Sequence, residues 1–326
     1  MSIITAIQLG QRSFPVNIIQ GPLAGISCAP FRRLTWEYSK PAFTCTEMIS
    51  CKTLIGENKY KERLIYKDPL EGPVCFQLSG SEPLELARAT QLATEYGADL
   101  IDLNCGCPVN KIRAKGSGSS LLADAKLLEQ LIATMRANTD IPLSIKIRVD
   151  GESHDHYNRE VAMVVRNSGL NFITVHARHW TDSYQQGPYY DQINYFVDTL
   201  DIPVIGNGDV SCLDSLNKML STGCAGVMVS RAGVGQPWLI GQLIAQAHQQ
   251  PFELPKAEVI AHLFVRHCKE LSLLLNNETL AVVQSRKLAK YYGRQLNNKE
   301  EFLKAIYCCK NLDDIESVAI LYFSYH

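Results

Sequence analysis

The sequence predicts an α/β fold, a (β/α)8 TIM barrel, followed by a small all-helical domain at the C-terminus. Short apolar runs rich in β-branched residues recur eight times, and each is followed by a turn signal and then by helical periodicity. This pattern stops near residue 248. Because a single core usually stops growing at roughly 250–300 residues, we expect a barrel domain over residues 1–244 and a helical domain over residues 245–326.

The predicted strands are 17–20, 43–47, 74–77, 100–104, 143–146, 172–176, 203–207 and 226–230. Their last residues are 23 to 42 residues apart, which is the length of a strand, a loop and a covering helix. Continuous apolar strands are typical of a parallel sheet covered by helices, and eight of them close into a barrel. An open doubly wound sheet is disfavoured, because the first turn reads Gly21-Pro-Leu-Ala-Gly25 and not GxGxxG.

The connecting segments fit this arrangement. Residues 3–9 and 13–18 flank Gly10-Gln11 and predict a hairpin that closes the lower end of the barrel. Helices are expected over 81–96, with Ser81 as N-cap, and over 123–137 and 212–222. Residues 249–255 read as a linker, and helical stripes follow it from Lys256.

Composition limits the function classes. The chain has 32 Lys and Arg against 33 Asp and Glu, which excludes a generally basic nucleic-acid coat. Its 11 scattered cysteines lack paired CxxC units, so we expect reduced thiols in a cytoplasmic protein and no metal site. Neither a signal peptide nor a membrane-spanning helix is expected, because the first 17 residues lack a basic start and no apolar run reaches about 18 residues.

Polar residues end all eight predicted strands. They are Gln20, Glu47, Gln77, Asn104, Lys146, His176, Asn207 and Ser230, the last followed by Arg231. In a barrel of this type the active site is built at the carboxyl ends of the strands. The sequence therefore predicts that these side chains surround one site.

Cys107 is the most reactive candidate, since it lies on a loop bounded by Gly106 and Pro108. A nucleophile, a metal ligand and a general acid are all open roles for its thiol, although Cys-Gly-Cys lacks the usual spacing of a chelating pair. The basic loop 111–118 follows it and is either a phosphate contact or a solvated surface loop.

The charges at the strand ends indicate an anionic ligand. Lys146 ends an otherwise apolar strand, where a cation is costly to bury without an anionic partner. Glycine-rich turns follow the last two strands, at Asn207-Gly-Asp209 and Ser230-Arg-Ala-Gly-Val-Gly235, where barrels often bind phosphate. A phosphorylated, electron-rich ligand such as FMN fits these features.

With these residues, nearly the whole chain resembles the tRNA-dihydrouridine synthases, and most closely the bacterial B subgroup. The shared motifs are Asn104-Cys-Gly-Cys-Pro108, Pro22-Leu-Ala-Gly25, Pro30-Phe-Arg32, Gln77-Leu-x-Gly80, Lys146-x-Arg148, His176-x-Arg178, Asn207-Gly-Asp209 and Arg231. The resemblance implies a cytoplasmic, monomeric enzyme that uses FMN and NADPH to reduce the C5–C6 double bond of a uridine in tRNA, with position 17 suggested by the subgroup.

The resemblance also implies roles for individual residues. Cys107 would donate the proton, and Asn104 and Arg178 would orient the uracil. FMN would contact Pro22, Leu23, Ala24, Gln77, Lys146, His176, Asn207, Gly208, Asp209, Ser230 and Arg231. The chain departs from the family at Leu23, Ala177, Ser230 and His179, where Met, Gly, Gly and Thr are usual; His179 either tunes substrate position or is a partly exposed loop residue.

Two other functions remain open at this point. One is a flavin barrel acting on a free pyrimidine, and the other is a tRNA-binding relative with weakened catalysis. The segment 284–310 favours RNA, because seven cations against two carboxylates give it a local charge of +5, with two tyrosines interleaved. We expect Arg286 and Lys287 in this segment to bind the tRNA.

Overall fold

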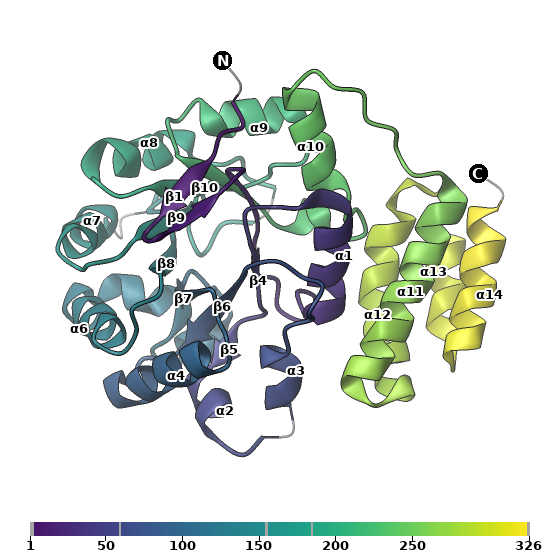
Figure 1. The fold of residues 1–326 in the computed structure, drawn as a ribbon, viewed down its shortest axis with the longest axis horizontal. Coiled ribbons are helices and arrows are strands. Elements are labelled where there is room, and N and C mark those ends of the chain that lie inside the picture. Colours follow the sequence, from purple (N-terminus) through teal and green to yellow (C-terminus); the bar gives the residue numbers. More distant parts are fainter. Residues whose placement is uncertain (1–2, 59, 154–155, 184, 325–326) are drawn as a thin grey trace.

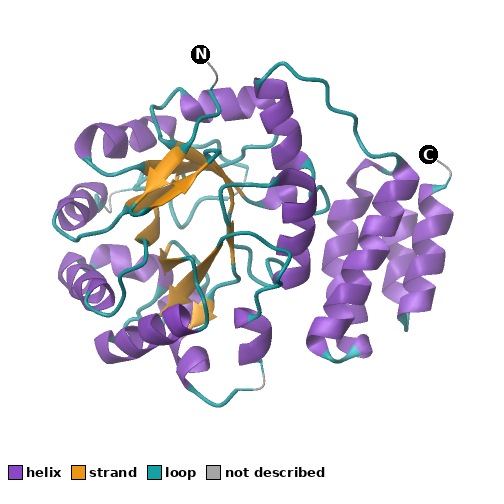
Figure 2. Cartoon of the chain, viewed as in Figure 1, coloured by secondary structure: helices purple, strands orange, loops and turns teal. Residues whose placement is uncertain are grey.

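A closed parallel barrel forms the larger part of the molecule (Figures 1 and 2). The computed structural model describes residues 3–58, 60–153, 156–183 and 185–324. The barrel strands are β3 (Ile18–Gln20), β4 (Thr44–Cys45), β6 (Val74–Ser79), β7 (Leu100–Cys105), β8 (Leu143–Arg148), β9 (Phe172–His176), β10 (Val204–Asn207) and β11 (Gly226–Val229). Strands β3 and β11 pair in parallel, as do β4 and β6, and these pairings close the circle. The predicted barrel is confirmed.

Helices surround the barrel, as Figure 2 shows, so the strands are buried on both faces. Those around the barrel are α1 (Ala29–Ser39), α2 (Cys51–Ile55), α3 (Lys61–Ile65), α4 (Pro83–Glu95), α5 (Asn110–Arg113), α6 (Ala125–Arg136), α7 (Asn158–Arg166), α8 (Tyr190–Thr199), α9 (Leu213–Leu220) and α10 (Leu239–Ala247), with 3-10 turns η1 (Gly118–Ala123) and η2 (Arg231–Gly233). The extra strand β5 (Ile49–Ser50) was not predicted.

The structure corrects two local predictions. Ser81 does not cap α4, because the helix begins at Pro83 after Glu82, and the Ser81 hydroxyl donates to the carbonyl of Lys115 at 2.9 Å. The strand expected over 43–47 shrinks to β4, two residues long, so Glu47 lies beyond its end. There Glu47 accepts a hydrogen bond from the amide of Gly25 at 2.5 Å.

A hairpin of β1 (Ile7–Leu9) and β2 (Arg12–Phe14) closes one end of the barrel, as predicted. Its side chains share a buried cluster with Leu100 and Phe172, which are the first residues of β7 and β9. The hairpin therefore covers the amino ends of the strands. The carboxyl ends are left available for a ligand site.

The C-terminal region is helical, as predicted, and packs beside α1 (Figure 1). It contains α11 (Ala257–Leu275), α12 (Glu278–Tyr292), the 3-10 turn η3 (Gly293–Gln295), α13 (Lys299–Cys308) and α14 (Leu312–Phe323). We call these helices the tail. Phe31 and Leu34 of α1 share one buried cluster with the tail, and Arg266 forms two hydrogen bonds with Glu37 of α1 at 2.9 and 2.6 Å. The predicted division between residues 244 and 245 falls inside α10.

Among the described helices, none is both long enough and apolar enough to span a bilayer.

Candidate active site

A cavity of about 680 Å³ lies at the carboxyl ends of the barrel strands. It brings together 13 of the 16 residues that the sequence singled out as site residues, which are Pro22, Leu23, Ala24, Gln77, Asn104, Cys107, Lys146, His176, Asn207, Gly208, Asp209, Ser230 and Arg231. Arg178, Arg286 and Lys287 do not line it, and neither do Gln20 and Glu47, which were also predicted to surround the site. Side chains from seven different strands or their following loops therefore meet in one space, as the barrel topology requires.

Lys146 is a buried cation in the floor of this cavity. Its Nζ donates to Asn207 Oδ1 at 2.8 Å, and no carboxylate in the described part of the chain forms an ion pair with it. Burial, reinforced by the nearby Arg148, lowers the Lys146 pKa to about 8. Asp102 acts on this pKa in the opposite direction but forms no ion pair with Lys146, so the buried cation favours an anionic ligand in the cavity.

A chain of buried hydrogen bonds connects the floor to the Cys107 loop. Asp102 accepts from Ser144 Oγ at 2.7 Å and from Gln77 Nε2 at 2.8 Å. Gln77 Oε1 accepts from Asn104 Nδ2 at 2.8 Å, and Asn104 Oδ1 accepts from the Cys107 amide at 2.9 Å. Because ionised Asp102 can only accept, it fixes the direction of both amides. Burial raises the Asp102 pKa to about 6, which leaves it ionised at neutral pH.

Further hydrogen bonds hold the Cys107 loop through the carbonyl group of Cys107. The Cys107 carbonyl accepts from the Ser119 amide at 3.0 Å and from the Ser119 hydroxyl at 3.1 Å, and Arg113 donates to that hydroxyl at 2.8 Å. Gly118 has φ +66°, and a Cβ there would lie 2.7 Å from the Cys107 carbonyl oxygen. Arg113 also stacks 3.4 Å over the Trp180 ring. The basic loop 111–118 is therefore partly helical and packed against its neighbours.

Cys107 differs from most other cysteines of the chain in its surroundings. All 11 cysteines are free thiols, and eight of them are buried, including Cys28, Cys45, Cys75 and Cys224. The Cys107 side chain is partly exposed and lines the cavity. Of the residues that the structure describes, no three His, Cys, Asp or Glu side chains gather to hold a metal ion.

The turns after β10 and β11 both line the cavity, and the first of them presents backbone amides that an anion could reach. Gly208 (φ +147°) and Asp209 (φ +48°) have left-handed backbone angles, and their N–H groups have no acceptor within the described chain. In the second turn, a Cβ on Gly233 would lie 2.4 Å from Gln20 Oε1. Backbone amides presented by such turns bind phosphate.

Three predicted residues lie elsewhere. Arg178 was expected to orient the uracil, but its side chain is fully enclosed, where it donates to the Gln186 carbonyl at 3.0 Å and pairs with Asp209. Arg178 is therefore not among the side chains that line the cavity. Arg286 lies 5.4 Å from the Tyr307 ring, and Lys287 is exposed near Gly25, outside the cavity lining.

The cavity also contains residues that the sequence did not single out as site residues. They are Met48, Gly106, Arg148, Val210, Ser211, Met228, Ala232, Lys290, Tyr291 and Arg294. Arg148 donates to the carbonyls of Gly106 and His179, both at 2.8 Å. Its position two residues after Lys146 on β8 could have predicted that Arg148 lines the cavity. For Lys290, Tyr291 and Arg294, the basic segment 284–310 could have predicted a place near the ligand.

The family departures have visible structural consequences. The Ser230 hydroxyl accepts from Asn207 Nδ2 at 3.2 Å, so it joins the group that holds Lys146. His179 is buried and stacks on Tyr157 at 6.2 Å between ring centroids, so it is not a partly exposed loop residue. His176 lines the cavity, and burial lowers its pKa well below the ordinary value, so its ring is neutral.

Comparison with known proteins gives consistent findings. A family model described as "Dihydrouridine synthase (Dus)" matches residues 19–317. The chain is 34% identical over 238 residues to the "Probable tRNA-dihydrouridine synthase 1" of Synechocystis sp., covering 73% of the chain and 67% of that relative. It is 32% identical over 272 residues to "tRNA-dihydrouridine synthase B" of Salmonella typhimurium, covering 81% and 83%.

Solved structures with similar folds include an old yellow enzyme homologue from Zymomonas mobilis, with a TM-score of 0.58 and 11% identity, covering 78% of this chain and 94% of that one. Morphinone reductase in complex with tetrahydroNAD gives a TM-score of 0.55 at 12% identity, covering 80% and 94%. At this level of identity the likeness shows the barrel fold alone.

Proposed function

The chain belongs to the dihydrouridine synthase family, and from this premise we propose that it reduces a uridine of tRNA to 5,6-dihydrouridine with FMN and NADPH. The observation that supports this most is the meeting of Cys107, Lys146 and the two glycine turns in one cavity. These groups provide a proton donor, a buried cation and a phosphate cradle within reach of one ligand.

The residues present fit FMN. A cavity of about 680 Å³ is within the range of cofactor sites, roughly 300–1,000 Å³. Among the described residues Lys146 forms no ion pair with a carboxylate, and the amides of Gly208 and Asp209 have no acceptor, so both can bind an anion. We assign the phosphate to the turns after β10 and β11 and the flavin ring to the floor around Gln77 and Lys146.

Bound FMN would supply the hydride, from N5 to uracil C6. Cys107 then protonates C5 from its thiol, and the thiolate regains a proton from solvent. Its backbone is held in place by Asn104, whose amide direction is fixed through Gln77. Lys146 stabilises negative charge in the cavity, where burial makes its charge more effective than in water.

We assign uracil contacts to Asn104 and Arg148, since both line the cavity beside Cys107. Arg178 is reassigned as a positioning residue, because it holds the Asp209 carboxylate together with Arg231, whose Nη2 lies 3.2 Å from Asp209 Oδ1.

The tail supports tRNA as the substrate. Lys290, Tyr291 and Arg294 bring cations and an aromatic ring to the cavity, while Lys287 is exposed near Gly25. A small free pyrimidine would not need this basic extension, whereas phosphates and bases flanking the target uridine would contact it. Acting on tRNA, the enzyme would work in the cytoplasm, and we expect a monomer.

The test is to measure dihydrouridine in tRNA from a strain that lacks the gene and carries either the wild type or the Cys107→Ala variant. We expect the wild type to restore dihydrouridine at one position and Cys107→Ala to fail. Full restoration by Cys107→Ala would contradict the general-acid role. If no position changes, tRNA is the wrong substrate, and a yellow purified protein would then indicate a flavin enzyme acting on another pyrimidine.

A further inference from the structure

One tail residue contacts the turn after β11 directly. Arg294 donates from Nη1 to the Ala232 carbonyl at 3.3 Å and from Nη2 to the Val234 carbonyl. Its Nε donates to the Tyr291 carbonyl at 2.9 Å, which fixes the guanidinium within its own helical turn. The side chain thus bridges the tail and the turn, and it also lines the cavity.

The packing at this contact leaves no free space. Gly235 ends the turn with φ +70°, and a Cβ there would lie 2.7 Å from both the Tyr291 carbonyl carbon and the Tyr292 nitrogen. The backbone at the end of α12 therefore packs directly against the backbone of the turn.

The carbonyls of the turn are bound on the protein side. Ser230 O accepts from Gln20 Nε2 at 3.3 Å and from the Gly233 amide at 3.2 Å, and Arg231 O accepts from the Val234 amide at 3.2 Å. The Gly233 carbonyl accepts from the Gln236 amide at 3.1 Å, and Arg294 binds the remaining two carbonyls, those of Ala232 and Val234. With their carbonyls held away, such turns present their positive side to an anion. The guanidinium charge adds to this effect.

We propose that Arg294 is a positioning residue that holds the turn of residues 230–234 by its carbonyls, so that affinity for a phosphate-bearing flavin depends on the docked tail. The proposal rests on the proposed flavin function. By reciprocity, a flavin that carries the phosphate also stabilises docking of the tail onto the barrel.

The experiment compares FMN with riboflavin, which lacks the phosphate, by titrating flavin fluorescence with flavin-free protein. Arg294→Gln is expected to weaken FMN binding about tenfold and riboflavin binding less than about twofold. Arg294→Lys keeps the charge, but a single nitrogen cannot bind both carbonyls, so it should lose nearly as much FMN affinity. Arg294→Lys also tests the proposal if Arg294→Gln does not fold.

Arg266→Gln is the matched control, because Arg266 also joins the tail to the barrel, through Glu37, but does not touch the turn. It should leave the ratio of the FMN and riboflavin affinities unchanged. Equal losses for both flavins in the Arg294 variants, or full FMN affinity in Arg294→Lys, would overturn the proposal. If the wild type binds neither flavin, the proposed function itself fails.

Discussion

Replacing Lys146 by methionine should stabilise the flavin-free protein while weakening flavin binding. Methionine keeps most of the length of the side chain and removes the charge. Burial lowers the Lys146 pKa from 10.5 to about 8, which corresponds to about 3 kcal/mol of unfolding free energy lost at neutral pH. Methionine leaves Asn207 Oδ1 without its 2.8 Å donor, at a cost of about 1–2 kcal/mol. The net expectation is a gain of about 1–2 kcal/mol.

The pH dependence gives the prediction a sign that can be checked. Below pH 8 Lys146 is charged in both the folded and the unfolded protein, so the folded protein bears the whole cost of burying the charge. Between about pH 8 and 10.5 the unfolded chain binds more protons than the folded one, so wild-type stability rises with pH relative to Lys146→Met. Near pH 10.5 folded Lys146 is neutral, so wild type no longer bears the cost of a buried charge. Lys146→Met still lacks the hydrogen bond to Asn207, so wild type should then be the more stable of the two proteins.

The assay is urea unfolding of flavin-free protein at pH 7 and pH 10.5. Lys126→Met is the control, because Lys126 is exposed on α6 and the same change there should stay within about 0.5 kcal/mol. FMN titration of the same samples should show weaker binding for Lys146→Met alone. A Lys146→Met protein less stable than wild type at pH 7 would refute the view that the buried charge of Lys146 destabilises the flavin-free protein.

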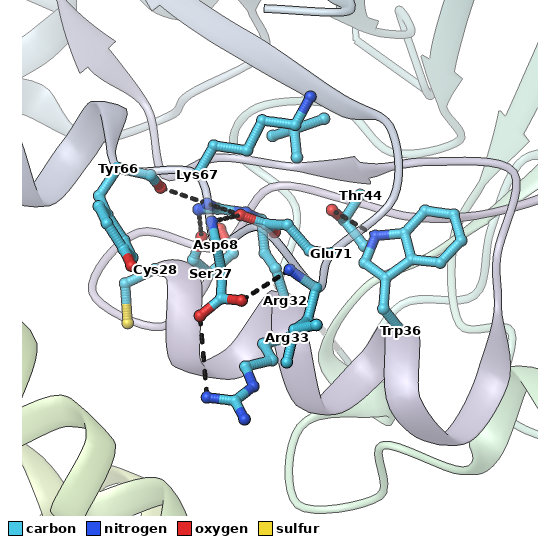
Figure 3. Close-up of polar contacts among 12 residues, drawn as sticks. Ser27, Cys28, Arg32, Arg33, Trp36, Thr44, Tyr66, Lys67, Asp68 and Glu71 are labelled. Carbon is cyan, nitrogen blue, oxygen red and sulfur yellow. Dashed lines mark hydrogen bonds and ion pairs between the residues drawn. The ribbon is translucent and has the colours of Figure 1, made fainter. Parts of the chain in front are cut away.

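Three further changes test other parts of the structure. Gly118→Ala places a Cβ 2.7 Å from the Cys107 carbonyl oxygen, so uridine reduction should slow at least about tenfold while FMN affinity is kept; an unchanged rate would count against the positioning of Cys107. Arg32→Met leaves the fully buried Glu71 carboxylate, bound by two 2.8 Å hydrogen bonds (Figure 3), without its partner, and should cost about 3–5 kcal/mol in urea unfolding; a loss under about 1 kcal/mol would argue against this pair. Lys290→Gln should lower tRNA affinity, and the slope of the logarithm of the binding constant against the logarithm of salt concentration should fall by about one, as expected for the loss of one phosphate contact. Lys126→Gln should change neither quantity.

The strand ends of the barrel could be predicted from the sequence because their spacing and apolar character are local properties. Lys146, His176 and Asn207 end apolar runs, and the barrel topology places the ends of all strands on one side. Cys107 was predictable for the same reason, since its loop follows β7 directly. The glycine-rich turns after β10 and β11 were also visible in the sequence, and their binding of phosphate stays a prediction.

Other parts of the site depend on packing between segments that are distant in sequence. Arg178 lies two residues after His176, yet its side chain is buried against Asp209 and the Gln186 carbonyl, and no local pattern shows that. Arg294 reaches the cavity only because α11 docks on α1 and thereby places α12 beside the turn after β11. Ser81 had the right residue type for a cap, but its hydroxyl binds the Lys115 carbonyl of another loop.

The central claim is that hydride from the bound flavin and a proton from Cys107 are added to a uridine of tRNA. The most direct test is a single turnover, in which prereduced protein is mixed with tRNA lacking dihydrouridine, without NADPH or oxygen. Flavin reoxidation with an equimolar yield of dihydrouridine is expected, and Cys107→Ala should slow it at least about 100-fold. Reoxidation that yields no dihydrouridine, or that proceeds equally well in Cys107→Ala, would contradict the account.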